Sequence, residues 1–180
     1  MKLALATAVL LATTCSGIGS ASPSPAAAPS PSAGRSPASR AVVGVPPPGA
    51  EAVEGGCGGT QLYKHGELTG WALVNAPTFL PYAVAAPGTA VGYLFSYPLV
   101  AGTGNKILWY VGIPRDGHPL VAQGHPVGAS GPVVTFSSLA NSGPGEIYPS
   151  GPSAPAAGCW HFTLDWGGGQ RHAAVDLAFR

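Results

Sequence analysis

Residues 160–179 read WHFTLDWGGGQRHAAVDLAF. Large apolar side chains occupy every second position before the three glycines, and the same period returns after them. A period of two places these side chains on one face of a β-strand. Two such runs around a glycine-rich turn predict an antiparallel hairpin, with strands over 160–166 and 173–179.

Further upstream, residues 107–113 are apolar at nearly every position, which predicts a central strand covered on both faces. Shorter strands, separated by Gly/Pro turns, are predicted over 82–86, 91–97, 120–123 and 133–137. The fold class predicted for residues 50–180 is therefore all-β, an immunoglobulin-like antiparallel β-sandwich. Five aromatic residues fit its alternating core positions: Phe95, Trp109, Trp160, Trp166 and Phe179.

Three cysteines are present: Cys15, Cys57 and Cys159. If Cys15 is lipidated or removed, the other two form a pair in an oxidising compartment. A disulfide between Cys57 and Cys159 would close a loop of about a hundred residues and stabilise the domain by a few kcal/mol. Because Cys159 points away from the face of Trp160, we expect this bridge at the sandwich edge. Reactive or metal-binding thiols are the alternative, and they need a reducing setting or nearby ligands.

The chain begins with Met1-Lys2 and an apolar run over residues 3–12. A cationic start, a short apolar run and small residues after it predict a signal peptide over residues 1–21. Two cleavages remain open. Lipoprotein-type processing before Cys15 would leave a lipid on that cysteine, although Ala12 and Thr14 depart from the lipobox pattern. Cleavage by the general signal peptidase after Ala21 would instead release a secreted protein.

Residues 16–49 are rich in Pro, Ala and Ser, and Arg35 and Arg40 are their only charged residues. Such a segment buries too little apolar surface to offset its ordering entropy, so we expect a disordered linker. Residues 50–180 carry seven acidic and five basic side chains, a net charge of about −2. Without a basic stripe or a cationic amphipathic helix, nucleic acid is not an expected partner.

Five histidines invite a search for catalytic or metal sites. None has the H-x-x-x-H or H-E-x-x-H spacing of a zinc site, and no glycine-rich segment has the Walker or dinucleotide spacing. His161 and His172 could approach across the turn of the last hairpin, where ordinary surface residues are the simpler interpretation. A triad assembled from Ser130, His125 and Asp116 is a selection from many serines. We therefore expect no catalytic residue, no metal ligand and no cofactor.

A further group of aromatic residues lies in turn-rich stretches: Tyr63, Trp71, Phe79, Tyr82 and Tyr148. Exposed rings in a row could stack on sugars or bind a partner protein. Rings that cover the ends of the sandwich are the alternative, and the one favoured here.

Four segments together resemble uncharacterised secreted proteins and lipoproteins of actinobacteria: CGGTQLY (57–63), KILW (106–109), GEIYPS (145–150) and GCWHFTL (158–164). The resemblance covers most of residues 57–180, and the last segment is its most specific part. It implies a C-terminal immunoglobulin-like domain in which GCW opens a late strand. That group carries no assigned activity, so the resemblance implies no catalytic or ligand-binding residue.

These patterns predict an extracytoplasmic, non-catalytic binding or structural module of the cell envelope. We expect it to be a monomer, anchored to the cell membrane through a lipid on Cys15 or else secreted, with a protein or glycan partner. Two alternatives stay open: a secreted hydrolase with an unfamiliar active site, and an accessory lipoprotein that binds a small ligand between its sheets.

Overall fold

The computed structural model describes residues 46–68 and 79–180, which belong to a compact unit formed by residues 38–180. The predicted signal peptide, Cys15, linker residues 16–45 and Trp71 lie outside the described residues. Near the predicted domain boundary, the carbonyl of Pro48 accepts a hydrogen bond from the N–H of Glu67.

All regular elements of the described residues are β-strands. They are β1 (Ala50–Cys57), β2 (Thr60–His65), β3 (Tyr82–Ala85), β4 (Ala90–Leu94), β5 (Ile107–Val111), β6 (Leu120–Pro126), β7 (Val134–Ser138), β8 (Ile147–Ser150), β9 (Gly158–Trp166) and β10 (Arg171–Phe179). Their order in the sheet is β7-β6-β9-β10-β1-β2-β3-β4-β5-β8, and all neighbours pair antiparallel. The all-β antiparallel prediction is confirmed, and immunoglobulin-like connectivity stays a prediction.

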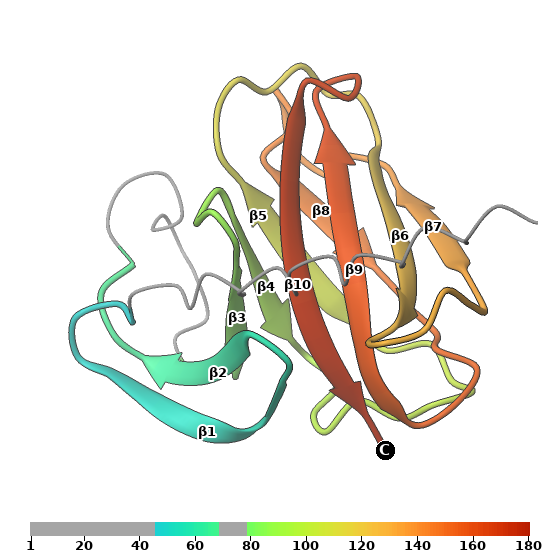
Figure 1. Ribbon diagram of the computed structural model, residues 1–180. Coiled ribbons are helices and arrows are strands. Elements are labelled where there is room, and N and C mark those ends of the chain that lie inside the picture. Colours follow the sequence, from blue (N-terminus) through green and yellow to red (C-terminus); the bar gives the residue numbers. More distant parts are fainter. Residues whose placement is uncertain (1–45, 69–78) are drawn as a thin grey trace, which may run out of the picture. The chain divides into compact units, whose positions relative to one another are not determined.

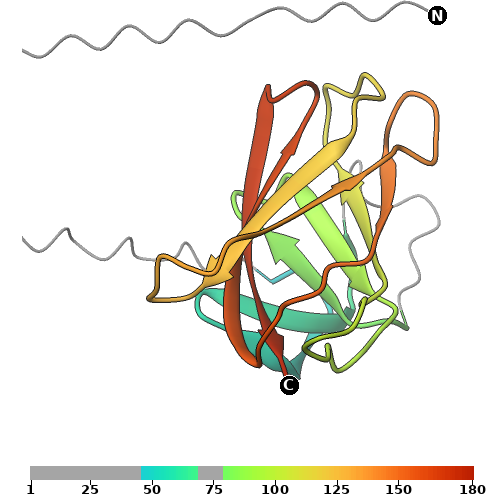
Figure 2. The same cartoon turned by 90° about the vertical axis from the view of Figure 1, so that its right-hand side faces the viewer.

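The strands lie in two layers that face each other (Figures 1 and 2). We call β7, β6, β9 and β10 the front layer, and β1, β2, β3, β4, β5 and β8 the back layer. The layers meet where Gly56 of β1 pairs with Leu177 of β10, the one register pair between these two strands. A bridge between Ala86, just after β3, and Ala174 of β10 adds a second connection.

Large side chains from both layers fill the space between them. The back layer contributes Trp109 and Tyr148, and the front layer contributes Trp160, Phe162 and Trp166, each at most 1% exposed. The three indole N–H groups donate to oxygens, those of Ser150, Ala156 and Gly112. Each buried indole N–H therefore has a hydrogen-bond acceptor, as is usual for polar groups in a protein core.

The predicted C-terminal hairpin is confirmed. β9 and β10 pair along their whole length, from Arg171–Trp166 to Phe179–Gly158. Gly167, Gly168 and Gly169 all have positive φ in the turn, a conformation that glycine adopts at little cost. The prediction of a central, doubly covered strand is confirmed for residues 107–111 (β5), since Trp109 on one face and Tyr110 on the other are both buried. It is wrong at its end, because Ile113 lies beyond the strand and is 74% exposed.

Other predictions need correction. Phe95 was expected in the core, but β4 ends at Leu94 and the Phe95 ring is 42% exposed, with the Lys106 ammonium 4.7 Å from its centre. The N–H groups of Phe95 and Ser96 both donate to the Lys106 carbonyl, which breaks the alternation of the strand. Three strands lack a predicted counterpart: β1, β2 and β8. Their small and polar residues hide the two-residue period.

The outer face of the back layer holds a row of four tyrosines, Tyr63, Tyr82, Tyr93 and Tyr110, on β2, β3, β4 and β5. Successive ring centres lie 6.0, 5.7 and 5.5 Å apart. All four rings are buried. Exposed stacking rings are thus ruled out for Tyr63, Tyr82 and Tyr148, whereas Phe79 is 70% exposed.

Candidate functional site

The outer face of the front layer holds three of the five histidines of the domain and two of its aspartates. We define the front outer face by eight of the outward-pointing residues of β6, β9 and β10: Gln123, His125, His161, Thr163, Asp165, His172, Ala174 and Asp176. The strand register arranges them in cross-strand rows, since residues directly opposite each other have Cβ atoms about 5 Å apart.

The first row is His125, His161 and Asp176. The rings of His125 and His161 have centres 5.4 Å apart, with planes inclined by 44°. Nδ1 of His161 lies 2.7 Å from Oδ1 of Asp176, and Nδ1 of His125 lies 3.0 Å from the carbonyl oxygen of Pro126. Three ionisable side chains from three strands are thus brought together.

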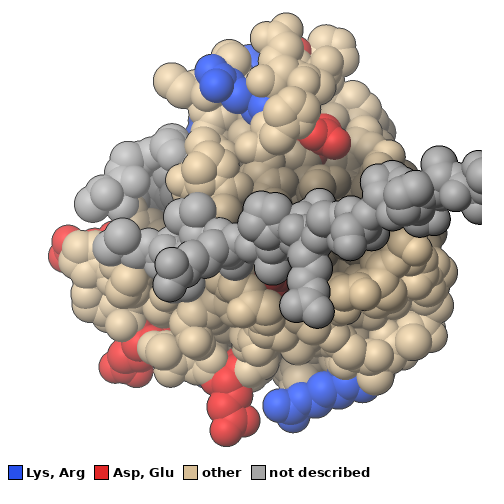
Figure 3. Space-filling view, in the orientation of Figure 1, with Lys and Arg blue, Asp and Glu red and all other residues tan. Residues whose placement is uncertain are grey.

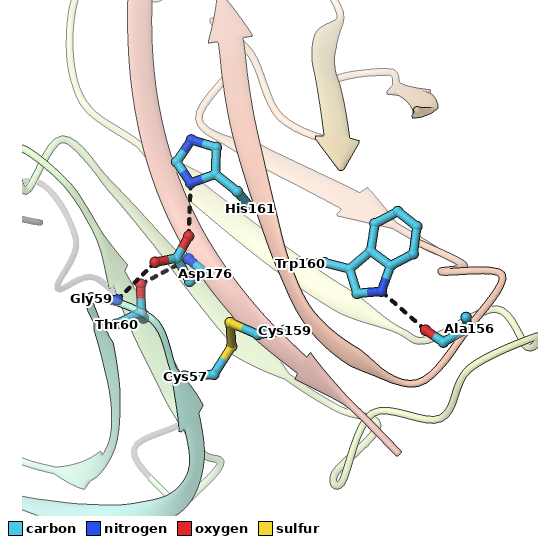
Figure 4. Close-up of a disulfide and its surroundings, with 8 residues drawn as sticks. All are labelled: Cys57, Gly59, Thr60, Ala156, Cys159, Trp160, His161 and Asp176. Carbon is cyan, nitrogen blue, oxygen red and sulfur yellow. Dashed lines mark hydrogen bonds and ion pairs between the residues drawn. A yellow bond between two sulfur atoms is a disulfide. The ribbon is translucent and has the colours of Figure 1, made fainter. Parts of the chain in front are cut away.

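Asp176 also connects this row to the turn between β1 and β2 (Figure 4). Its Oδ2 accepts a hydrogen bond of 2.7 Å from the N–H of Gly59, and its own N–H donates to the hydroxyl of Thr60. A Cβ added to Gly58 would lie 2.2 Å from the same oxygen, and Gly58 has φ +55°, so the turn requires glycine there.

The disulfide lies beside this contact. Cys57 and Cys159 are bonded, with their Cα atoms 5.8 Å apart, as the sequence predicted. The bond joins the end of β1 to the start of β9, and both cysteines are half-buried and outside the central core. Disulfide and carboxylate therefore hold the same turn against the front layer.

A second histidine–aspartate pair lies at the other end of the front outer face. His172 of β10 is opposite Asp165 of β9, and its Nδ1 contacts Oδ1 of the aspartate. The sequence left open an approach of His161 and His172 across the turn, but the register pairs each with an aspartate of the facing strand. Beside this pair is an open hollow of about 420 Å³, lined by Ala86, Pro87 and the Asp165–His172 pair among others.

The triad of Ser130, His125 and Asp116 does not assemble. Asp116 lies instead 2.6 Å from Nδ1 of His118, and Ser130 is an exposed residue of the connection between β6 and β7. The N–H of His118 donates to Asp116, and this bond, helped by the His118 ring, lowers the pKa of the Asp116 carboxyl.

Asp176 was missed by the sequence reasoning, although the alternation of the last hairpin already placed it on the polar face that carries His161. The missing information was the register between the two strands. Within residues 46–68 and 79–180, no three His, Cys, Asp or Glu side chains gather as a metal-binding group. No helix among these residues has the length and hydropathy needed to cross a bilayer.

Charged side chains are sparse on the described surface seen in Figure 3, where the acidic and basic groups lie scattered. This sparseness agrees with a chain in which 8% of the residues are charged. The chemistry available on the front outer face is therefore that of imidazole, carboxylate, amide and hydroxyl groups.

Comparisons with known proteins give little further information. No family profile and no curated protein matches the sequence. Among solved structures, a Bacillus anthracis protein described as a "Putative Lipoprotein" is similar, with a TM-score of 0.41 and 16% identity. The match covers 59% of this chain and 82% of that chain. A likeness of this size carries no conclusion about fold or function, and the resemblance to actinobacterial secreted proteins stays a prediction.

Proposed function

We propose that this chain is an extracytoplasmic, non-catalytic module of the cell envelope, anchored by a lipid on Cys15, that binds a protein or glycan partner through the front outer face. The observation that carries this proposal is the Cys57–Cys159 disulfide. Disulfides of this kind persist in oxidising compartments, outside the cytoplasm. The signal-like start of the sequence supports the same location.

The form of the front outer face supports binding rather than chemistry. Its polar groups stand on three paired strands, and Gln123 and Thr163 at its centre are exposed. A rigid strand surface with amide, hydroxyl and imidazole groups suits hydrogen bonding to a polar partner such as a peptide or a sugar.

Anchoring is tested by metabolic labelling with a fatty acid. We expect label on the wild-type protein and none on the Cys15→Ser variant, which lacks the acceptor thiol. An unlabelled protein recovered from the culture medium with Ser22 as its first residue would contradict the anchor and favour cleavage after Ala21.

Binding is tested with a photo-crosslinking residue at Gln123, on the front outer face, and a matched one at Ser153, an exposed position outside it. We expect an adduct in intact cells at position 123 that position 153 does not give. Equal adducts at both positions, or none at either, would contradict a partner on this face.

The hollow beside His172 favours a second candidate function, a secreted hydrolase or a binder of a small ligand. In a hydrolase, His172 would act as a general base and Asp165 would orient its ring. Chromogenic ester and glycoside substrates test this, and turnover must fall in His172→Ala. It must persist in His118→Ala, the control, because His118 also contacts an aspartate but does not line the hollow. Saturable binding of a ligand without turnover would favour the accessory role.

A further inference from the structure

On the front outer face, His125 and His161 form a close pair of rings, an arrangement that hydrogen bonding to a partner does not require. They lie opposite each other on β6 and β9, and both side chains are half-buried. Each strand of this pair is central in the front layer, since β7 flanks β6 and β10 flanks β9. The two imidazoles are therefore held on a rigid base, on the same face, side by side.

The hydrogen bonds of both rings determine which nitrogen carries the proton. Nδ1 of His161 faces a carboxylate oxygen of Asp176, and Nδ1 of His125 faces the carbonyl oxygen of Pro126. A carbonyl and an ionised carboxylate only accept hydrogen bonds, so Nδ1 must be the donor in each ring. In the neutral form of both rings the lone pair is therefore on Nε2.

Among the residues that the structure describes, none makes a hydrogen bond to Nε2 of either histidine. Two lone pairs from adjacent rings thus remain for a ligand that accepts electron pairs. Like His161, His118 and His172 each contact an aspartate through Nδ1. Neither of them, however, lies in ring contact with a second histidine.

The ring separation agrees with chelation of one metal ion. With metal–nitrogen bonds of about 2.0–2.1 Å and a tetrahedral angle, the centres of two bound imidazoles lie about 5.2 Å apart. The observed centres of His125 and His161 are 5.4 Å apart.

We propose that Nε2 of His125 and Nε2 of His161 bind a divalent transition-metal ion on the front outer face. Imidazole nitrogen suits Zn²⁺, Ni²⁺ and Cu²⁺, and Cu²⁺ binds most tightly to a given nitrogen site. Water molecules complete the coordination, because the two histidines are the only described protein ligands at this position.

Asp176 supports this site from behind. A metal-binding histidine usually donates its other ring N–H to a carboxylate or a backbone carbonyl, which orients the ring and raises the basicity of the ligand. Both kinds of partner occur here, Asp176 for His161 and the Pro126 carbonyl for His125. Asp176 is a positioning residue, and its carboxylate is also held by the N–H of Gly59. The proposal does not depend on the proposed function.

Calorimetric titration of the purified protein, prepared without a polyhistidine tag, with Zn²⁺, Ni²⁺ and Cu²⁺ salts tests the site. We expect one equivalent of metal to bind, most tightly for Cu²⁺. His125→Ala and His161→Ala should each weaken binding at least about tenfold, and Asp176→Asn should weaken it about 10- to 100-fold. His172→Ala, on the same face, is the matched control and should bind as the wild type does.

Far-UV circular dichroism checks that each variant is folded, and the mass of the intact protein checks that its disulfide is formed. If an alanine variant is not folded, His125→Gln or His161→Gln replaces it. Absence of stoichiometric binding to the wild type overturns the proposal. So does binding that survives in both His125 and His161 variants, or that falls equally in His172→Ala.

Discussion

Two core glycines lie directly beneath aromatic rings of the neighbouring strand. Gly92 of β4 is opposite Trp109 of β5, and Gly124 of β6 is opposite Phe162 of β9. A Cβ at Gly92 would lie 2.5 Å from the indole, and one at Gly124 would lie 2.3 Å from the phenyl ring. Both rings are buried on all sides, so neither can move away.

Gly92→Ala and Gly124→Ala should therefore lower the free energy of unfolding by about 1–3 kcal/mol each, the usual cost of overpacking a core. Urea denaturation measures the effect. Gly151→Ala is the control, because that glycine is exposed and a Cβ there meets nothing within 4 Å. Equal stability of all three variants would show that the aromatic rings give way.

The Asp176 carboxylate makes two contacts on the front outer face, one with His161 and one with the N–H of Gly59. Asp176→Ala removes the acceptor for the Gly59 N–H and the partner of His161, from a side chain only 13% exposed. We expect the free energy of unfolding to fall by about 1.5–3 kcal/mol, the contribution of hydrogen bonds to a charged group. Thermal unfolding measures this loss, with Asp165→Ala as the comparison. Asp165→Ala should have a smaller effect, because His172, the partner of Asp165, is largely exposed.

At the scale of elements, the tyrosine row ties four adjacent strands of the back layer together. The Tyr82 hydroxyl donates to the His65 carbonyl, so its O–H is already satisfied in the fold. Burial, with the nearby Tyr63 as the second cause, raises the pKa of Tyr82 from 10.0 to about 12. Burial likewise raises the pKa of Tyr93 and Tyr110.

A raised pKa in the folded state means that folding favours the protonated tyrosine. Its contribution to stability is complete below pH 10 and is lost as the pH rises from 10.0 to about 12. We expect the protein to lose stability in this window, with tyrosinate absorbance rising together with unfolding. In the Tyr82→Phe variant the new side chain cannot ionise, so the pH at which the protein unfolds in alkaline solution should be higher than in the wild type. A transition that does not move would exclude Tyr82 as its cause.

At the scale of the whole molecule, few backbone pairings connect the two layers, although side chains of both fill the space between them. β1 and β10 share the register pair Gly56–Leu177, and the disulfide and the Asp176 contact lie next to it. Cys57 and Cys159 are 102 residues apart in sequence, so the bond closes a loop that spans most of the domain. Constraining such a loop in the unfolded chain is the main source of disulfide stabilisation in the chain-entropy view.

The double variant Cys57→Ser, Cys159→Ser should therefore lose about 2–5 kcal/mol of unfolding free energy. Urea denaturation with and without reductant measures this. Reductant should destabilise the wild type to a similar extent and leave the double variant unchanged. Alkylation of Cys57 or Cys159 in the folded protein before reduction would contradict the bond itself.

The sequence by itself determined the strands with a clear two-residue period. Trp160 and Phe162 alternate with polar residues because one face of their strand is buried, and this local pattern predicted β9, β10 and the all-β class. The Cys57–Cys159 disulfide was equally predictable, because only these two cysteines remain once Cys15 is lipidated or removed. β1, β2 and β8 were missed because their small and polar residues leave no clear period.

Only the tertiary structure decided which polar groups meet. His125, His161 and Asp176 lie on three strands, and the pairing of β6 with β9 brings His125 to a ring 36 positions away in sequence. Likewise, the burial of Tyr63 and Tyr82 depends on contacts between strands rather than on their own turn-rich segments. The physical reason is that register and burial come from packing between distant segments, whereas period and turns are local properties of the chain.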